Sequence, residues 1–423
     1  MKEELLHYVW RMQRFDCTNL FTTQSQKITI IQFGNHNQNA GPDFTHARIQ
    51  IDDTLWIGNV EMHLKASDWM KHGHQRDPAY ENVILHVVLE EDLPITHQDG
   101  TRIPCLELHS RISPKVAKLY KGMQHNTDWI PCQKLLPGVP PITRQLWLDR
   151  LLVERLEERC LSLKEVLKEN KFDWEACLYS SLARSFGMKV NADAFEQLTK
   201  ILPYTFVRKH RHNLLQLESL FFGQAGLLKE TFSESYPLHL QREYQFLAHK
   251  FQLKAMPAIY WKFLRMRPAN FPTIRLAQLA KLYHQTEYLF SKVLAIQSLI
   301  EVEHLFDIQV AGYWKDHYLL DKISVPKVKA LGKGTIHILT INTIAPILFL
   351  YGKEKDLPAF CELALYLLES IPPESNHLIT KWGELDFYAE NAYQSQALLQ
   401  LFKKYCQPKH CLNCSIGGAI LKN

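Results

Sequence analysis

The sequence predicts an α/β N-terminal domain followed by a mostly α-helical domain. Two observations predict this fold class. Short β-rich runs separated by turn residues fill residues 27–109, and apolar residues recur at helical spacing after about residue 131. The opening residues, 1–15, also space their apolar side chains as an amphipathic helix does. A helix, several strands and then further helices in this order favour a mixed sheet in the N-terminal domain.

The predicted strands are KITIIQF (27–33), HARIQI (46–51), TLWIGNVEMHL (54–64), NVILHVVLE (82–90) and IPCLELH (103–109). Asp52-Asp53 and Asp99-Gly100 have the composition of turns between them. A proline-rich stretch at 131–141 then leads into the helical region. We therefore expect a first domain over 1–130, a helical domain over 131–405, and a cysteine-containing tail over 406–423 that packs on the rest.

The bulk composition is that of a globular protein, with 46% apolar and 22% charged residues in a chain of 423. A formal charge of +5 permits a nucleic-acid partner without requiring one. The start of the chain lacks the pattern of a secretory signal, and the apolar stretch 341–351 is shorter than the about 20 residues that span a bilayer. Nine mostly scattered cysteines indicate a reducing compartment. We expect a cytoplasmic protein without a membrane segment, and the sequence does not indicate its oligomeric state.

Acidic residues on neighbouring predicted strands form the main candidate site. Asp43 precedes one strand and Glu61 lies within the next, where Glu61, His63 and Lys65 share one face because strand residues alternate. Two carboxylates brought together in this way suit Mg²⁺ or Mn²⁺, which would position a phosphodiester and activate a water molecule. His63 or Lys65 would then activate the water or stabilise the developing charge.

Pro42-Asp43 and Glu61-Met62-His63, in this strand context, resemble the PD-(D/E)xK superfamily of phosphodiesterases. The resemblance covers about the first 110 residues and implies a restriction-endonuclease-like α/β fold and nuclease activity on DNA or RNA. It also implies an accessory acid from the preceding helix, Glu3 or Glu4. His63 stands where the superfamily has lysine. Lys65 or His63 takes over that role, or the domain is a catalytically inactive binding or scaffold protein.

A second group of polar residues follows directly, in SDWMKHGHQRDPAY. His72, His74 and Asp77 lie close together in sequence, and a His-x-His pair followed by an aspartate can hold Zn²⁺, Mn²⁺ or Fe²⁺. This pattern favours an alternative function, a metallohydrolase that acts on a substrate other than nucleic acid. Solvated loop histidines are the simpler interpretation of the same residues.

The C-terminal segment contains Cys406, Cys411 and Cys414 within nine residues. In a reducing compartment this spacing is typical of a thiolate metal site, either structural Zn²⁺ or a [4Fe–4S] cluster. Such a site needs a fourth ligand, for which Cys132 is the first candidate and His410 the local alternative. Free buried or surface thiols remain the other interpretation.

Several stretches along nearly the whole chain resemble an uncharacterised bacterial family described as a domain of unknown function. They are AGPDF, GNVEMHLKASDW, NVILHVV, RPANFPTIRLAQLA, SQALLQLFKKYC and CLNCSIG. The resemblance implies a bacterial protein and no particular activity. The sequence shows no P-loop, dinucleotide-binding fingerprint or Ser-His-Asp signature, so nucleotide-driven and acyl-transfer chemistry have no support.

Overall fold

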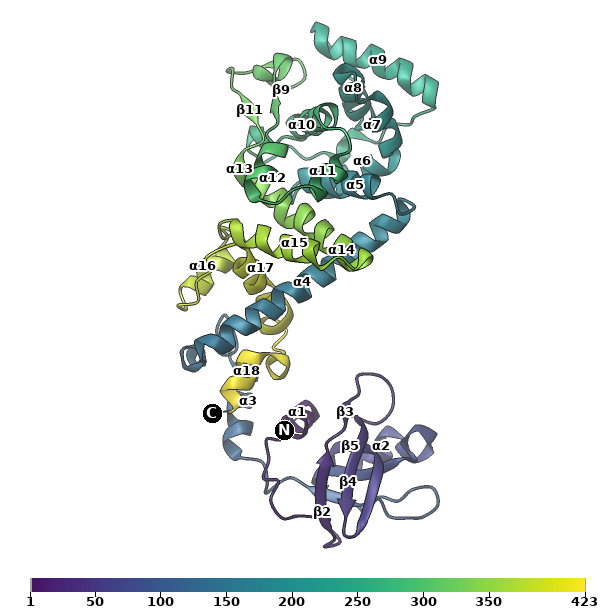
Figure 1. Cartoon of the computed structure of the whole chain (residues 1–423), viewed down its shortest axis with the longest axis vertical. Helices are drawn as coiled ribbons and strands as arrows, with labels where there is room; N and C mark the ends of the chain where they lie inside the picture. Colours follow the sequence, from purple (N-terminus) through teal and green to yellow (C-terminus); the bar gives the residue numbers. More distant parts are fainter. Residues whose placement is uncertain (1, 423) are drawn as a thin grey trace. The chain divides into compact units, whose positions relative to one another are not determined.

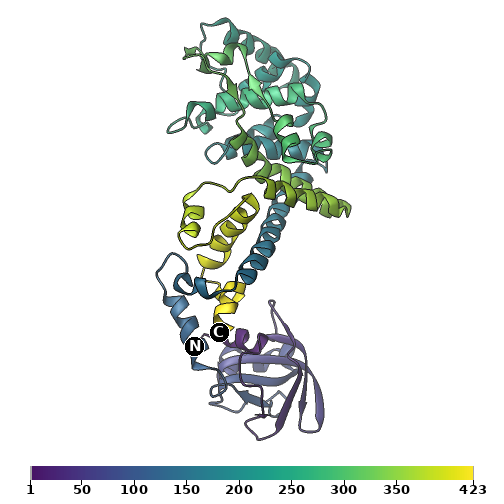
Figure 2. The same cartoon turned by 60° about the vertical axis from the view of Figure 1, so that its left-hand side comes forward.

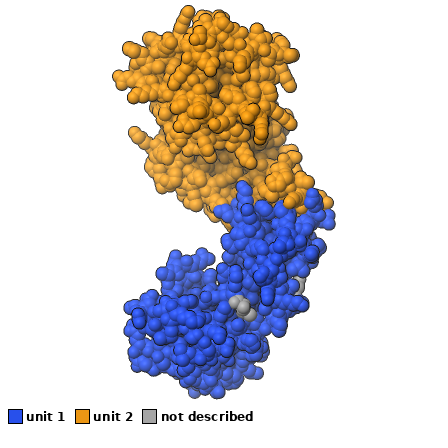
Figure 3. Space-filling view, turned by 180° about the vertical axis from the view of Figure 1, so that it is seen from behind, with its two compact units in different colours: residues 1–148, 384–386, 400–423 blue, residues 149–383, 387–399 orange. Residues whose placement is uncertain are grey.

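The computed structural model describes residues 2–422, and the chain forms two compact units (Figure 3). Unit 1 comprises residues 1–148, 384–386 and 400–423, and unit 2 comprises residues 149–383 and 387–399. The boundary therefore lies later than the predicted residue 131, and the C-terminal segment belongs to the N-terminal unit. The reason is that the last helix packs against the helical segments that follow the sheet.

The elements of unit 1 are α1 (Glu3–Arg11), β1 (Leu20–Phe21), β2 (Lys27–Gln32), β3 (Asn35–His36), β4 (Phe44–Ile51), β5 (Thr54–Lys65), α2 (Asp68–His72), η1 (His74–Arg76), η2 (Pro78–Tyr80), β6 (Val83–Glu90), β7 (Cys105–Glu107), α3 (Pro114–His125), η3 (Gln133–Gly138), η8 (Leu401–Cys406), η9 (Cys411–Asn413) and α18 (Ser415–Lys422). Helix α4 (Pro141–Glu169) begins in unit 1 and continues into unit 2. The expected strands are confirmed, each within a few residues.

The strands of unit 1 form one mixed sheet in the order β1-β2-β4-β5-β6-β7, with β3 also paired to β4 (Figure 1). Strands β2, β4 and β5 pair antiparallel, whereas β6 runs parallel to β5 and β7 parallel to β6. The parallel register places Glu61 opposite His86. Helix α1 packs against β5 through a buried face that includes Leu5, Leu6 and Val9, the spacing of an amphipathic helix.

Gly58 divides β5 into an exposed half and a buried half. A Cβ at this position would lie 2.5 Å from Ile84 Cγ2 and 2.7 Å from the Asn82 carbonyl oxygen, so only glycine lets β6 approach this closely. Asn59 is half-buried, and the next four residues of β5, Val60 to His63, are buried. The close approach thus places the centre of β5, with its polar side chains, in the interior of unit 1.

Unit 2 is mostly helical, as expected. Its elements are α5 (Trp174–Phe186), α6 (Ala192–Ile201), α7 (Tyr204–His210), α8 (Leu214–Gln224), α9 (Ser235–Phe251), η4 (Ala258–Tyr260), η5 (Pro268–Asn270), α10 (Pro272–Gln285), α11 (Leu289–Leu294), α12 (Leu299–Leu305), β8 (Gln309–Val310), η6 (Gly312–Lys315), β9 (His317–Leu319), β10 (Lys322–Ile323), β11 (Lys329–Ala330), α13 (Lys333–Leu339), η7 (Thr340–Ile344), α14 (Ala345–Lys355), α15 (Pro358–Ser370), α16 (His377–Gly383) and α17 (Ala392–Gln400). Within it, α5 packs against α6, α8 against α9 and α10, and α14 against α15 (Figure 1). Figure 2 shows the same predominantly helical unit from a second side.

The apolar stretch around 341–351 belongs to one continuous helical segment, Lys333–Lys355, which is longer than the sequence pattern suggested. Asn342 and Pro346 do not end it. The helix passes through a π-helical turn, where the Ile341 carbonyl and the Asn342 side chain accept hydrogen bonds from the Arg159 guanidinium, both at 2.9 Å. The segment is long and apolar enough to cross a membrane, but 67% of its most apolar stretch is buried inside the protein. A core helix of a globular unit has the same properties.

Candidate metal centre

The candidate centre lies where β4, β5 and β6 of unit 1 run side by side. Asp43 immediately precedes β4, and Glu61 and His63 lie in the buried half of β5. Glu61 and His63 face the same side of the sheet, as the alternation of strand residues predicted, since His63 Nε2 lies 3.7 Å from Glu61 Oε1. Both side chains are nearly inaccessible to solvent.

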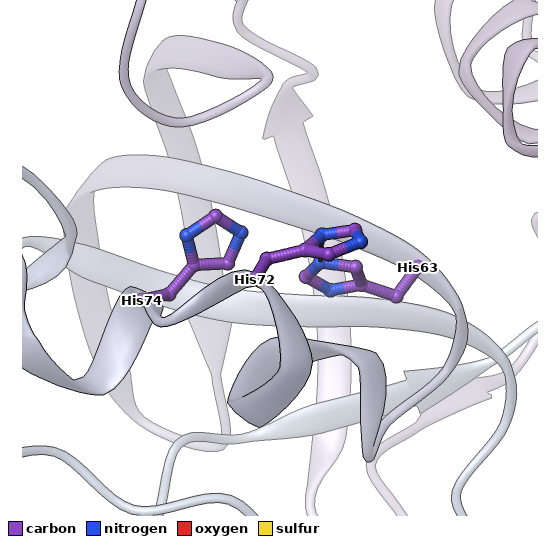
Figure 4. A group of neighbouring side chains, drawn as sticks. All are labelled: His63, His72 and His74. Atoms are coloured by element: carbon purple, nitrogen blue, oxygen red, sulfur yellow. Dashed lines mark hydrogen bonds between the residues drawn. The ribbon is translucent and has the colours of Figure 1, made fainter.

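Two further histidines reach the same place from the segment after β5. His72 ends α2, and His74 follows it after Gly73. Gly73 has a backbone φ of 80°, a left-handed conformation that glycine adopts without steric cost. The chain therefore turns sharply between the two histidines, and the rings of His63, His72 and His74 gather beside one another (Figure 4).

The two acidic residues are joined by reciprocal hydrogen bonds. The backbone N–H of Asp43 donates to Glu61 Oε2, and the backbone N–H of Met62 donates to Asp43 Oδ2, each at 3.0 Å. Asp43 Oδ2 also lies 3.2 Å from Nε2 of His7, a residue of α1. Asp43 and Glu61 therefore lie together, as the sequence predicted. One oxygen of each carboxylate accepts a hydrogen bond from the backbone at or next to the other acidic residue.

The remaining oxygen of Glu61 faces the imidazoles. Glu61 Oε1 lies 3.2 Å from His74 Nε2 and 3.7 Å from His63 Nε2. His63 Nε2 is in turn 3.1 Å from His72 Nδ1, and on its other side His63 Nδ1 is 2.9 Å from His86 Nε2. The donor atoms of His63, His72 and His74 all lie within 4.8 Å of one another.

The three histidines can together hold a single transition-metal ion, because their donor atoms all lie within 4.8 Å of one another. In a tetrahedral centre with bonds of about 2.1 Å, neighbouring donor atoms are about 3.4 Å apart, close to the 3.1 Å between His63 Nε2 and His72 Nδ1. Glu61 Oε1 approaches His74 and His63 but does not belong to this group, so it would have to move toward His72 to share the same ion. In the tautomer in which His63 Nδ1–H donates to His86 Nε2, the lone pair of His63 Nε2 points toward His72 and Glu61. His86 would then act as the outer partner that orients a metal-binding imidazole.

Burial sets the protonation of these groups. It lowers the pKa of His63 to about 2, with further lowering by the surrounding imidazoles, and lowers the pKa of His86 to about 4. Both rings are neutral at ordinary pH, which is the form that binds metal ions. Burial, followed by the negative charge of Asp43, raises the pKa of Glu61 to about 9. In the absence of metal, the Glu61 carboxyl therefore remains protonated at neutral pH, and this proton takes the place of a metal cation.

Helix α1 contributes a charged edge to the site. Burial opposes the charge of His7, but the hydrogen bond and charge of Asp43 outweigh it and raise the pKa of His7. Glu3, one helical turn earlier on the same face, has a pKa raised by burial and is influenced by the charges of His7, Asp43 and His72. Glu4 instead accepts a hydrogen bond from Tyr120 at 3.5 Å. Of the two candidate accessory acids, Glu3 is the one beside the site.

Aromatic side chains hold the imidazoles in place. Tyr80 stacks on His74 with ring centroids 3.8 Å apart. Trp69, which is 2% exposed, has its ring centroid 6.4 Å from His63, 5.4 Å from His74 and 5.3 Å from His86. Rings packed in this way have little rotational freedom, so the donor atoms of His63 and His74 are preorganised, whereas His72 is exposed.

Two predicted site residues lie outside the cluster. Lys65 is the last residue of β5, its side chain is exposed, and its charge acts on Asp92. Asp77 is also exposed, and its carboxylate caps η2 by accepting from the backbone N–H of Ala79 at 2.9 Å. Strand β5 ends at Lys65 and the chain turns into α2, which carries the lysine beyond the buried face. The structure therefore favours neither Lys65 as a catalytic group nor Asp77 as a metal ligand.

Two further histidines at the site, His7 and His86, were not among the site residues predicted from the sequence. A signal for each is nevertheless present. His86 is the polar interruption of an otherwise apolar strand, and His7 follows Glu3 by four residues on an amphipathic helix. Their proximity to the site depends on the pairing of β5 with β6 and on the packing of α1, which local sequence patterns do not contain.

The fold and the site together define a two-unit protein with a mixed α/β unit that carries a candidate histidine-rich metal centre. The chain belongs to the family described as "Protein of unknown function (DUF2851)", whose model matches residues 3–377. This confirms the expected membership of a family of unknown function, and the match includes the whole candidate centre. The comparisons with curated proteins and with solved structures gave no match.

Proposed function

We propose that unit 1 is a divalent-metal-dependent phosphodiesterase, a nuclease acting on DNA or RNA, whose metal ion is held by Glu61 with His63, His72 and His74. The observation that carries the proposal is the position of Glu61. One of its oxygens accepts a hydrogen bond from the backbone of Asp43, and the other lies within 3.7 Å of two imidazole nitrogens. A carboxylate held between an acid and neutral imidazoles is a typical metal ligand.

The donor set favours a transition-metal ion. The sequence pointed to Mg²⁺ or Mn²⁺ on Asp43 and Glu61, and Mg²⁺ requires oxygen ligands in near-octahedral geometry. Three imidazole donors beside Glu61 instead suit Zn²⁺, Mn²⁺ or Fe²⁺. Of the two ions expected from the sequence, Mn²⁺ therefore suits this donor set and Mg²⁺ does not. When bound, such an ion supplies a Lewis acid and a water molecule of lowered pKa.

His7 is the cation that we propose for the site in place of a lysine. Its pKa is raised and its Nε2 lies 3.2 Å from Asp43 Oδ2, and both favour the protonated imidazolium. The His7 side chain is 21% exposed, while its Nε2, which faces Asp43, is buried. In our proposal protonated His7 stabilises the charge that develops on the phosphate oxygens, the role for which Lys65 was considered.

The substrate class rests on the resemblance to the PD-(D/E)xK superfamily. That resemblance requires an aspartate at the start of one strand, a glutamate within its antiparallel neighbour, and a preceding helix. Asp43 before β4, Glu61 within β5, and α1 with Glu3 satisfy these requirements. We therefore propose a restriction-endonuclease-like fold for this part of unit 1.

Two other functions remain as alternatives. The number of imidazoles favours a metallohydrolase that acts on a substrate other than nucleic acid, since histidine ligands are common in catalytic zinc sites. The outward position of Lys65 favours an inactive fold that serves as a binding or scaffold protein. Metal binding separates the first alternative from the second, and phosphodiester cleavage separates both from the proposed nuclease.

The test combines metal analysis of the purified chain with cleavage of plasmid DNA, RNA and a chromogenic phosphodiester in Zn²⁺, Mn²⁺ or Mg²⁺. We expect cleavage with Mn²⁺ or Zn²⁺, and a loss of about hundredfold in Glu61→Gln and His72→Ala. Lys65→Ala and Asp77→Ala are matched controls that should retain activity, since both side chains lie outside the cluster. Metal binding without phosphodiester cleavage would support the other hydrolase, and absence of both would support the scaffold; either result overturns the nuclease proposal.

A further inference from the structure

A second group of metal-type side chains lies in unit 1, far from the first in sequence. Cys132, Cys406, Cys411 and Cys414 are all buried, with exposed fractions between 7% and 9%. Cys132 precedes the other three by more than half of the chain. Their arrangement therefore depends on the fold of unit 1.

The helical segments that bear these cysteines pack against one another. Cys132 directly precedes η3, which contacts α18, and Cys414 directly precedes α18. Cys411 opens η9, which contacts both α18 and η8, and Cys406 ends η8. The four thiols thus lie at the meeting ends of four short elements.

Electrostatic interactions show that the thiols share one environment. Burial raises the pKa of Cys132 to about 12, and the charges of Cys414 and Cys411 raise it further. For Cys406, burial is again the largest cause, and all three other thiols contribute. By contrast, Cys177 in unit 2 is fully buried, and its pKa is raised by burial and by the charge of Asp173.

The C-terminal turn is tied to the region around Cys132. Lys409 Nζ donates to the carbonyl oxygens of Gln124 and Asn126 at 2.6 and 2.9 Å, and Gln124 Nε2 donates to the Lys409 carbonyl at 3.0 Å. His410, the alternative fourth ligand, is exposed, and its Nδ1 lies 3.0 Å from the Lys404 carbonyl oxygen. The fold therefore selects Cys132 over His410 as the partner of the clustered cysteines.

The turn between Cys411 and α18 has the close backbone packing of a metal-binding knuckle. A Cβ at Gly417 would lie 2.1 Å from the Cys411 carbonyl oxygen, so only glycine permits this approach. Burial raises the pKa of Cys414 to about 11, and the backbone N–H groups of Gly417 and Ile416 act in the opposite direction because they favour the thiolate.

We propose that Cys132, Cys406, Cys411 and Cys414 form a metal centre with four thiolate ligands, which fastens the C-terminal segment to the region between α3 and α4. Buried cysteine as a small apolar side chain is the ordinary alternative. It does not account for the gathering of four thiols from two distant segments. The centre is structural and independent of the proposed phosphodiesterase site.

The spacing of the thiols favours an iron–sulfur cluster over a single zinc ion. Among the side chains of residues 2–422, the group of three or more potential ligands whose donor atoms lie within 4.8 Å of one another is that of the three histidines. The four sulfurs are therefore not gathered as closely as those donor atoms. One Zn²⁺ ion would hold four sulfurs about 3.8 Å apart. A [4Fe–4S] cluster spreads its four thiolates over the corners of a cube and so fits sulfurs that are farther apart.

The test is the iron, acid-labile sulfide and zinc content of the full chain purified without oxygen and without added metal. We expect iron and sulfide in [4Fe–4S] stoichiometry with the visible absorption of such a cluster. Zinc at about one ion per chain, released by thiol-specific mercurials, would equally support four thiolate ligands and identify the other centre. Wild-type protein with neither metal at these thiols would overturn the proposal, whatever the variants do.

Single variants assign the ligands. Cys406→Ala and Cys414→Ala should lower the metal content at least about tenfold. Loss of a residue that only hydrogen-bonds to a metal ligand already costs about that much, and these variants remove a ligand itself. Cys177→Ala is the matched control, because it removes an equally buried thiol from unit 2. Equal metal loss in Cys177→Ala and Cys414→Ala would contradict a local centre. The phosphodiesterase activity of Cys414→Ala is measured alongside. Metal loss with cleavage retained shows that the cysteine centre and the histidine site are separate, so failure of one proposal can be distinguished from failure of the other.

Discussion

Replacing Glu61 with glutamine tests the buried carboxyl that anchors the candidate metal centre. In the metal-free folded state, burial and the charge of Asp43 raise the pKa of Glu61 from 4.5 to about 9. The folded state therefore holds this proton more tightly than the unfolded chain does. The resulting stability is fully present below pH 4.5 and is lost as the pH rises toward 9.

The magnitude follows from the width of that window. Between about pH 5.5 and 7.5, which lies inside it, wild-type protein should lose about 2.7 kcal/mol of unfolding free energy through Glu61, at about 1.36 kcal/mol for each pH unit. For a folding unit of the size of unit 1 this corresponds to about 5–11 °C in Tm. Glutamine carries no charge at either pH, so Glu61→Gln should lack this loss.

The assay is thermal unfolding of protein treated with a chelator, at both pH values, for wild type and Glu61→Gln. The difference between the two proteins removes the contribution of every group that titrates equally in both. Glu90→Gln, which replaces an exposed carboxyl of β6, is the matched control and should behave like wild type. Parallel pH dependence of wild type and Glu61→Gln would refute the reasoning. Adding Zn²⁺ or Mn²⁺ should abolish the wild-type loss, because the ion replaces the proton.

Further predictions concern metal affinity and two close backbone approaches. His72→Ala should weaken binding of Zn²⁺ or Mn²⁺ about tenfold or more in calorimetric titration, whereas Lys65→Ala should leave it unchanged. Gly58→Ala should lower the unfolding free energy by about 1–3 kcal/mol, measured by denaturant unfolding, because the added Cβ would meet Ile84 at 2.5 Å. Gly417→Ala should separate the C-terminal turn from Cys411, and limited proteolysis should then cleave the C-terminal segment faster than in wild type.

The division into a strand-rich region and a helical region could be predicted from the sequence because local periodicity carries it. The alternation of β5 correctly placed Glu61 and His63 on one face. The unit boundary could not be predicted in the same way. Residues 400–423 join the N-terminal unit through the packing of α18 on α3 and η3, a contact between segments that lie far apart in the sequence.

The candidate site shows the same limit at the level of single residues. The sequence by itself determined which residue types were available, Asp43 and Glu61 on adjacent strands and His72 and His74 in the loop that follows. Only the tertiary structure decided which of them meet, because strand pairing brought His86 behind His63 and the packing of α1 brought His7 to Asp43. Burial then raised the pKa of Glu61, which depends on the surrounding atoms of the folded chain and on no local pattern.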